Sequence, residues 1–180
     1  LIPAMLDAAP HLTLAMGRTF APVRAVVAER EINRVARVNA EVALVSAIPQ
    51  ASLILGPASA VADTLILTKN QAMLVLRLAV MYGLSIDRRR LAELLPLVGA
   101  GLGWRTLARE LVGFVPAGFG VLPKAAIAYA GTVAAGRAAL WYYDTGRQMP
   151  ERQLRLLRRA GFDEARDYVR QLAAKVRRTG

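Results

Sequence analysis

The side chains that most often carry out chemistry are scarce in this chain of 180 residues. It has no cysteine and a single histidine, His11, which excludes thiolate metal sites, a cysteine nucleophile and a histidine-based metal cluster. The adjacent acids Asp163 and Glu164 fall where a helix is expected to start, and acids there stabilise the helix dipole before they serve as catalysts. The sequence therefore predicts no catalytic, cofactor-binding or metal-binding residues, and we expect a protein that is not an enzyme.

Nucleotide-binding motifs are also missing from the sequence. A phosphate-binding loop needs the pattern GxxxxGK[ST], and no such string occurs. Residues 68–71 (TKNQ) resemble a guanine-reading [NT]KxD element, but Gln71 replaces the aspartate that would accept hydrogen bonds from the base. Gly99, Gly101 and Gly103 do not follow a predicted strand, as a dinucleotide-binding fingerprint would require. We therefore do not expect this chain to be a GTPase itself.

Two long apolar segments are interrupted by proline and glycine. Residues 42–62 carry no charge, and residues 111–136 carry only Lys124. A proline inside a helix removes a hydrogen bond and clashes with the preceding turn. We therefore predict that each segment folds back as a helical hairpin. The predicted tips are Pro49, Gly56 and Pro57 in the first hairpin and Pro116, Gly118, Gly120 and Pro123 in the second.

Helices are expected throughout, because no segment alternates with period two for long enough to form a strand. With 55% hydrophobic residues and a mean hydropathy of +0.34, the chain has enough apolar surface for one core. The predicted helices are 23–48, 58–82 (ending at Gly83), 88–98, 104–115, 124–143, and a terminal pair, 150–160 and 163–178, separated by Gly161. This is an all-α bundle of about six to seven helices, with an apolar domain in residues 1–144 and a basic helix pair in residues 145–180.

The predicted helix 58–82 carries one polar stripe. Asp63, Asn70 and Arg77 recur every seven residues and share one face. Apolar residues occupy nearly all of the remaining positions of the helix. A buried core helix and a membrane helix look alike at this length. Because a charge in lipid needs a partner or the interface, we predict that this buried polar stripe faces other helices or lies near the helix ends.

The predicted helix 124–143 has a surface of small residues. Ala128, Thr132 and Gly136 recur every four residues, so another helix can approach closely. Its length of about 30 Å matches a hydrocarbon core. In that setting, Arg137 is expected to extend towards an interface marked by Trp141. The alternative is an alanine-rich core helix in a bundle of helices.

The net charge of +11 is concentrated at the C-terminal end, where residues 145–180 carry ten basic and four acidic side chains. Aromatic residues followed by arginines are typical of the cytoplasmic headgroup region of a membrane. The predicted lipid or partner contacts are Trp141, Tyr142, Arg147, Arg152, Arg155, Arg158 and Arg159. The alternative is a solvated helix face. Nucleic acid is not expected as a partner, because aromatic residues do not alternate with the basic ones.

An ordered set of short motifs covers residues 48–143. These motifs are Ile48-Pro49, Gly56-Pro57, Ala62-Asp63, 67–71 (LTKNQ), 78–83 (LAVMYG), 101–105 (GLGWR), Leu107-Ala108, Val115-Pro116 with Gly118 and Gly120, 130–132 (AGT) and 136–139 (GRAA). In order and spacing the set resembles the uncharacterised bacterial family that includes YcjF. The resemblance implies an α-helical, membrane-associated domain of unknown biochemical role, with a GTPase partner in cis or in trans.

These observations together predict a non-enzymatic helical domain on the cytoplasmic side of the bacterial inner membrane, where it anchors or regulates a partner or fused GTPase. One alternative is a soluble scaffold or regulatory domain. Another is a pore or transporter component with Asp63, Lys69 and Arg77 along a polar path, and a homo-oligomer is compatible with each. No cofactor is expected. The chain opens at Leu1 rather than at a methionine, which we interpret as a fragment or a processed form.

Overall fold

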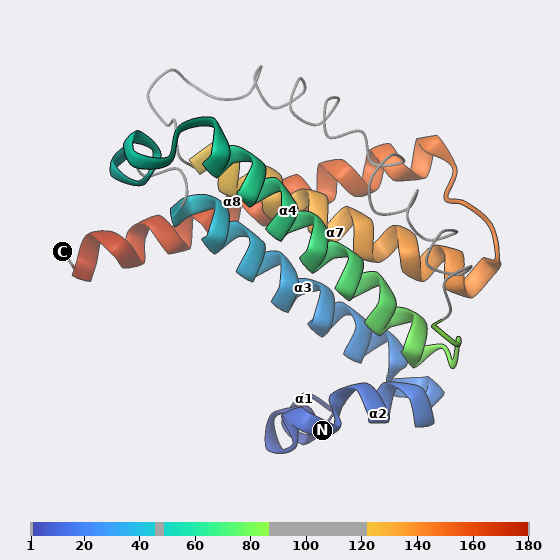
Figure 1. Cartoon of the computed structure of the whole chain (residues 1–180). Coiled ribbons are helices and arrows are strands. Elements are labelled where there is room, and N and C mark those ends of the chain that lie inside the picture. Colours follow the sequence, from blue (N-terminus) through green and yellow to red (C-terminus); the bar gives the residue numbers. More distant parts are fainter. Residues whose placement is uncertain (1, 46–48, 87–121, 180) are drawn as a thin grey trace.

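The computed structural model describes residues 2–45, 49–86 and 122–179, and the chain within these ranges is helical, without a strand (Figure 1). Two short helices, α1 (Ile2–Ala8) and α2 (Thr13–Thr19), flank the 3-10 turn η1 (Pro10–Leu12). The long helices are α3 (Ala21–Val45), α4 (Pro49–Met81), α7 (Leu122–Thr145) and α8 (Glu151–Thr179). The predicted all-α bundle is confirmed.

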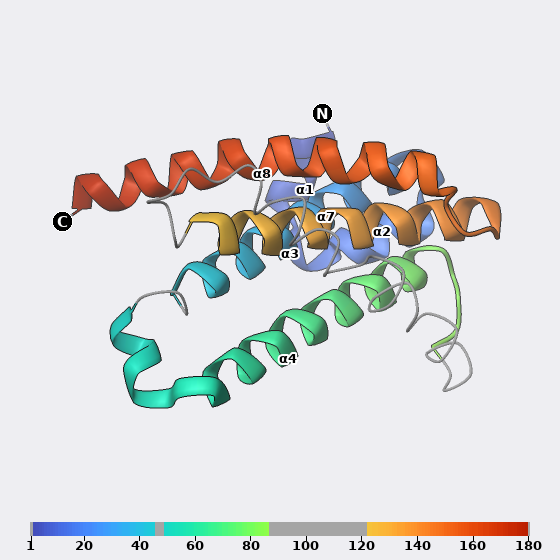
Figure 2. The ribbon, with the colours of Figure 1, turned by 90° about the horizontal axis from the view of Figure 1, so that it is seen from above.

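Helix α7 forms the centre of the bundle. It packs against α3 and α8 over most of its length and also contacts α4 (Figure 2). Nearly all of its described residues between Ala125 and Ala139 are buried. The alanine-rich segment is therefore a core helix surrounded by other helices of the chain, which was the alternative that the sequence left open.

Small residues on α7 let α3 approach closely, as predicted. A Cβ added to Gly136 would lie 2.5 Å from Cγ1 of Ile32 on α3, so only glycine fits at this crossing. The facing surface of α3 buries Ile32, Val35 and Ala36 at helical spacing. The glycine on α7 thus leaves room for the Ile32 side chain of α3 at this crossing.

One part of the predicted first hairpin is wrong, as the course of helix α4 shows. The helix begins at Pro49, but Gly56 and Pro57 lie inside it and do not form a tip. A proline in a helix interior removes one hydrogen bond and can bend the helix without ending it. Figure 2 shows such a bend in the first turns of α4, drawn in teal.

The other end of α4 matches its prediction. Gly83 has a φ of 72°, in the left-handed region that favours glycine. Its N–H donates to the carbonyl oxygen of Val80 at 3.0 Å, and the N–H of Leu84 donates to that of Ala79 at 3.1 Å. These bonds satisfy carbonyl groups that the end of a helix leaves without partners.

Most of the predicted second hairpin lies outside the described residues. This holds for Pro116, Gly118 and Gly120 and for the predicted helices 88–98 and 104–115. Pro123 lies in the first turn of α7, where a helix does not need the missing N–H.

The predicted break at Gly161 is wrong, because α8 is one continuous helix and not a helix pair. A glycine in a helix interior costs only about 1 kcal/mol relative to alanine. The buried side chains of Leu154, Ala165 and Val169 provide an apolar surface that continues past this position. Gly161 is itself buried, and a Cβ there would lie 3.5 Å from the carbonyl oxygen of Ala130 on α7.

Candidate functional site

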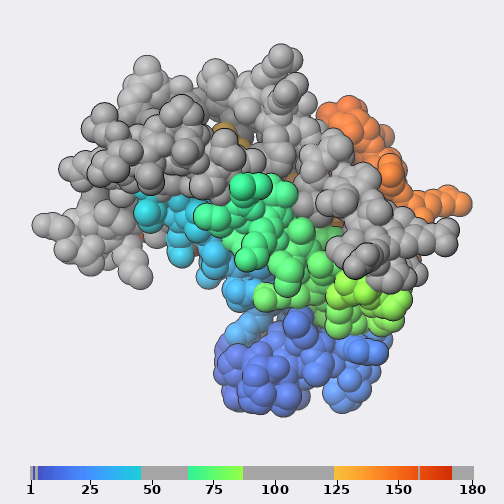
Figure 3. Space-filling view, viewed as in Figure 1, coloured from blue at the N-terminus to red at the C-terminus, as the bar shows by residue number. Residues whose placement is uncertain are grey.

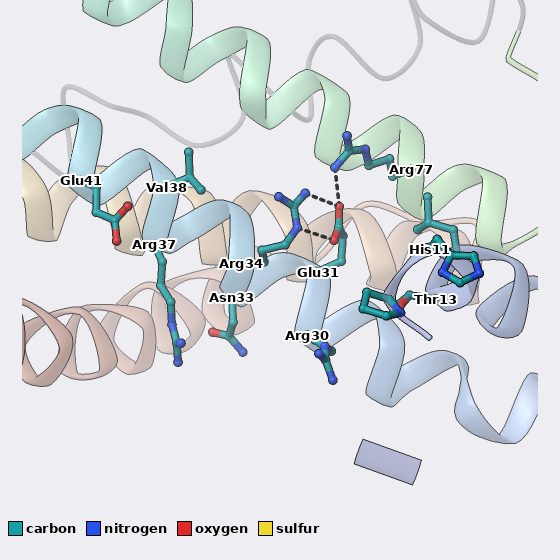
Figure 4. Close-up of a pocket in the computed structure, with 12 residues that line it drawn as sticks. His11, Thr13, Arg30, Glu31, Asn33, Arg34, Arg37, Val38, Glu41 and Arg77 are labelled. Carbon is teal, nitrogen blue, oxygen red and sulfur yellow. Dashed lines mark hydrogen bonds and ion pairs between the residues drawn. The ribbon is translucent and has the colours of Figure 1, made fainter. Parts of the chain in front are cut away.

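A groove of about 910 Å³ lies along the outward face of α3, beside the N-terminal helices that project from α3 and α4 (Figure 3). Figure 4 shows the side chains that line it. They are Pro10, His11, Thr13 and Leu14 from η1 and α2, Arg30, Glu31, Asn33, Arg34, Arg37, Val38 and Glu41 from α3, and Arg77 from α4. Four arginines against two glutamates give the lining an excess of positive charge.

At the centre of the groove, Glu31 holds two guanidinium groups from different helices. Arg34 donates from Nε and Nη2 to the two carboxylate oxygens at 2.8 and 2.7 Å, and Arg77 donates from Nη1 at 2.7 Å. The Glu31 side chain is only 10% exposed. Burial alone would raise its pKa, but the bonds from Arg34 and Arg77 outweigh burial, and the pKa is lowered.

At the far end of the groove, tyrosines from α7 and α8 contact residues that line it. Tyr168 donates to Oε1 of Glu41 at 2.9 Å, and the guanidinium of Arg37 lies 5.6 Å from the centre of the Tyr168 ring. Tyr129 stacks on Tyr168 at 5.3 Å and donates to Oδ1 of Asn33 at 3.0 Å. Burial, together with the bond to Glu41, raises the pKa of Tyr168 to about 12.

The groove offers hydrogen-bond donors to an anion. A guanidinium has five N–H groups. Among the hydrogen bonds between described residues, Arg34 donates through two of its N–H groups and Arg77 donates through one. Their side chains are 51% and 39% exposed. Among the described residues, no cluster of acidic or histidine side chains could hold a metal ion.

A second polar feature, which we call the polar seam, joins α3, α4 and α7 inside the bundle. It consists of Asn39, Asn70, Gln71 and Thr132. Asn39 donates to the hydroxyl of Thr132 at 2.8 Å, and Asn70 donates to Oδ1 of Asn39 at 2.7 Å. The bond from Gln71 to Thr132 is longer, at 3.4 Å, and Oε1 of Gln71 is buried with no partner in the described part of the chain. The seam therefore fixes α4 against both neighbouring helices.

The predicted polar stripe on α4 faces α3 at two of its three positions. Asn70 lies in the polar seam and Arg77 lies in the groove, where it pairs with Glu31. The side chain of Asp63 is outside the described part of the chain.

The surface of α8 carries an arginine face made of Arg152, Arg155, Arg159, Arg166 and Arg170. At 100° per residue these five positions fall within an arc of about 60°, and all five residues are exposed. The pairs Arg155–Glu151 and Arg170–Asp167 are loose, at 3.8 and 3.9 Å. The helical periodicity of the sequence extends the predicted arginine cluster to positions 166 and 170.

The remaining predicted contacts lie near the start of α8. Arg147 is exposed, Trp141 and Tyr142 are partly buried, and the side chain of Arg158 is not among those described. Tyr142 lies edge-on to Tyr143, with ring centres 5.9 Å apart.

Arg137 has a different place from the one expected. It does not extend towards Trp141 but lies between two acids, with Nε donating to Glu29 at 3.0 Å and Nη1 to Glu164 at 2.8 Å. These bonds, led by the one to Glu29, raise the pKa of Arg137. The reason is geometric, since α3 and α8 flank α7 and bring carboxylates within reach.

Comparisons with known proteins return no relative. No family model matches the chain, and neither the curated proteins nor the solved structures contain a match. The resemblance to the family that includes YcjF therefore stays a prediction. Within the described residues, no helix has the length and hydropathy that crossing a membrane requires.

The groove itself was not predicted from the sequence. Glu31 and Arg34 are three positions apart on a helix, a spacing that favours a local ion pair. Arg77 is 46 residues from Glu31, however, and His11 belongs to a segment for which no helix was predicted.

Proposed function

We propose that the chain is a non-enzymatic docking domain that binds the cytoplasmic surface of the bacterial inner membrane and anchors or regulates a partner or fused GTPase. The observation that supports membrane docking is the arginine face of α8. Its five exposed arginines share one side of a helix whose other side packs on α7. Each basic residue near an anionic membrane contributes about 1 kcal/mol.

Binding to lipid vesicles tests the membrane part of this proposal. In a flotation assay, the chain is expected to float with vesicles that contain anionic phosphatidylglycerol. When the vesicles consist of neutral phosphatidylcholine, the chain is expected to remain unbound. A triple variant, Arg152→Gln, Arg155→Gln and Arg159→Gln, is expected to bind on the order of 100-fold more weakly. Equal binding of both proteins to anionic vesicles would contradict the assignment of the arginine face.

The matched control removes arginines elsewhere. Arg18 and Lys69 are exposed and lie on α2 and α4, away from α8 in the sequence. A variant that carries Arg18→Gln and Lys69→Gln is expected to retain most of the vesicle binding. A loss as large as that of the triple variant would indicate attraction by net charge alone.

The GTPase part of the proposal derives from the resemblance. Its test is GTP hydrolysis by the adjacent or fused GTPase, with and without this domain and with and without anionic vesicles. A hydrolysis rate and a membrane-bound fraction that do not respond to the domain would contradict it.

A scaffold or regulatory domain that makes no lipid contact is the second candidate. The burial of α7 among α3, α4 and α8 favours it, because the apolar faces of that helix meet protein. Failure to bind anionic vesicles, combined with an effect on the GTPase, would support this candidate over the first.

A further inference from the structure

We propose that the groove along α3 binds an acidic peptide segment of a partner protein. The inference deepens the proposed function, because it assigns a site for the partner, and it does not depend on membrane binding. What points to this ligand is the combination of arginine donors, an apolar strip and the length of the groove.

The donors are held in place before any ligand arrives. Glu31 anchors Arg34 and Arg77 at 2.7 Å each, so their guanidinium groups lie together on the groove wall. One buried carboxylate against two guanidinium groups leaves an excess positive charge there. A carboxylate from a ligand would form charge-assisted hydrogen bonds with the remaining N–H groups, and these bonds are stronger than neutral ones.

The rest of the lining suits a peptide better than a simple anion. Leu14 and Val38 add apolar surface beside the arginines, and Val38 is 40% exposed. From Arg30 to Glu41 the groove follows α3 for about 16 Å, at 1.5 Å per residue. An extended chain rises about 3.3 Å per residue, so about five residues fit this length. Alternating acidic and apolar side chains would meet both kinds of lining.

The test uses fluorescence anisotropy with the whole chain. One probe is a fluorescein-labelled pentapeptide of alternating glutamate and leucine, and the comparison probe has lysine in place of glutamate. The acidic peptide is expected to bind, more weakly at high salt, and the lysine peptide is not. Equal affinity for the two peptides, or no binding of the acidic one at low salt, would overturn the proposal.

Two variants locate the binding site. Arg34→Gln removes donors while Arg77 still pairs with Glu31, and it is expected to weaken binding by about tenfold or more. Val38→Glu places a negative charge on an exposed position without breaking a bond and is expected to weaken binding similarly. It keeps the test valid if the first variant folds poorly. Unchanged affinity in a folded Val38→Glu variant would overturn the proposal.

The arginine face of α8 provides the control. Its triple variant is expected to bind the acidic peptide as the unaltered chain does but to lose vesicle binding. Arg34→Gln is expected to bind the acidic peptide more weakly and to keep vesicle binding. If the triple variant lost peptide binding to the same extent as Arg34→Gln, the net charge of the chain alone would account for peptide binding. That result would overturn the proposal. Loss of vesicle binding by Arg34→Gln to the same extent as by the triple variant would assign the groove to lipid headgroups, which also overturns it. Failure of vesicle binding alone affects only the membrane assignment.

Discussion

The Cβ that Gly136 lacks would lie 2.5 Å from Cγ1 of Ile32, so α7 and α3 pack at their observed distance only with glycine at this position. Gly136→Ala is therefore expected to lower the free energy of unfolding by about 1–3 kcal/mol, because the added methyl group overpacks the core. Urea unfolding followed by circular dichroism measures this change.

The matched control is Gly161→Ala on α8, where the nearest atom is 3.5 Å from the added Cβ. Alanine is there expected to leave stability unchanged or to raise it by up to about 1 kcal/mol, because it favours the helix. Because Ile32→Ala removes Cγ1, Gly136→Ala is expected to cost less in an Ile32→Ala background than in the unaltered chain. Equal effects of the two glycine substitutions would contradict the close crossing.

Thr132 carries the centre of the polar seam. Thr132→Val keeps the shape of the side chain but leaves the amide nitrogens of Asn39 and Gln71 without their acceptor. The expected loss is about 1–3 kcal/mol in the free energy of unfolding. The same substitution at the exposed Thr68, within α4, should change stability by no more than about 0.5 kcal/mol. A loss at Thr68 that equals the loss at Thr132 would count against the seam.

Glu31 makes stability depend on pH in the acid range. Its pKa in the folded chain is lowered from the usual value of 4.5. The folded state is therefore stabilised in full above about pH 4.5, and this contribution is lost as the pH falls through the lower folded pKa. Glu31→Gln is expected to be less stable at pH 7, and the gap to the unaltered chain should narrow as the pH falls from about 5 to 3. Urea unfolding at several pH values measures this gap, and a constant gap would argue against the ionised pair.

Tyr82 gives a signal at alkaline pH. Burial, together with its hydrogen bond to Asp144 at 2.7 Å, raises the pKa of Tyr82 to about 12. Because this pKa is raised, the stabilising contribution is complete below about pH 10 and is lost as the pH rises through about 12. Tyr82→Phe should remove about one tyrosine from the absorbance step near pH 12, and Asp144→Asn should shift the ionisation of Tyr82 to lower pH. An unchanged step in Tyr82→Phe would be inconsistent with the raised pKa of this hydroxyl.

Features that depend on local sequence were predictable. The end of α4 at Gly83 and the small-residue face of α7 both follow from the order of residues along one helix. The polar seam and the groove were not predictable, because Asn39 and Thr132 are 93 residues apart and only the packing brings them together. For the same reason Gly161 was misread: a glycine that ends a helix and one that fits against a neighbouring helix look the same in sequence.

The predicted tips show a limit of reading proline alone. Pro49 and Pro123 do lie in the first turns of α4 and α7, where proline is well tolerated. Pro57 lies inside α4, and whether a proline ends a helix or bends it depends on what the following residues pack against. For α4 those residues include Leu74 and Leu78, which are fully buried.

The polar seam also sets the alignment of the helices. The core of α7 is largely alanine, and alanine contacts would be replaced by similar contacts if α4 slid along its neighbours. A slide of one turn, about 5.4 Å, would instead break the bonds of Asn70 and Gln71 at the same time. Of all the positions that a small-residue surface would tolerate, the amide and hydroxyl groups select a single register.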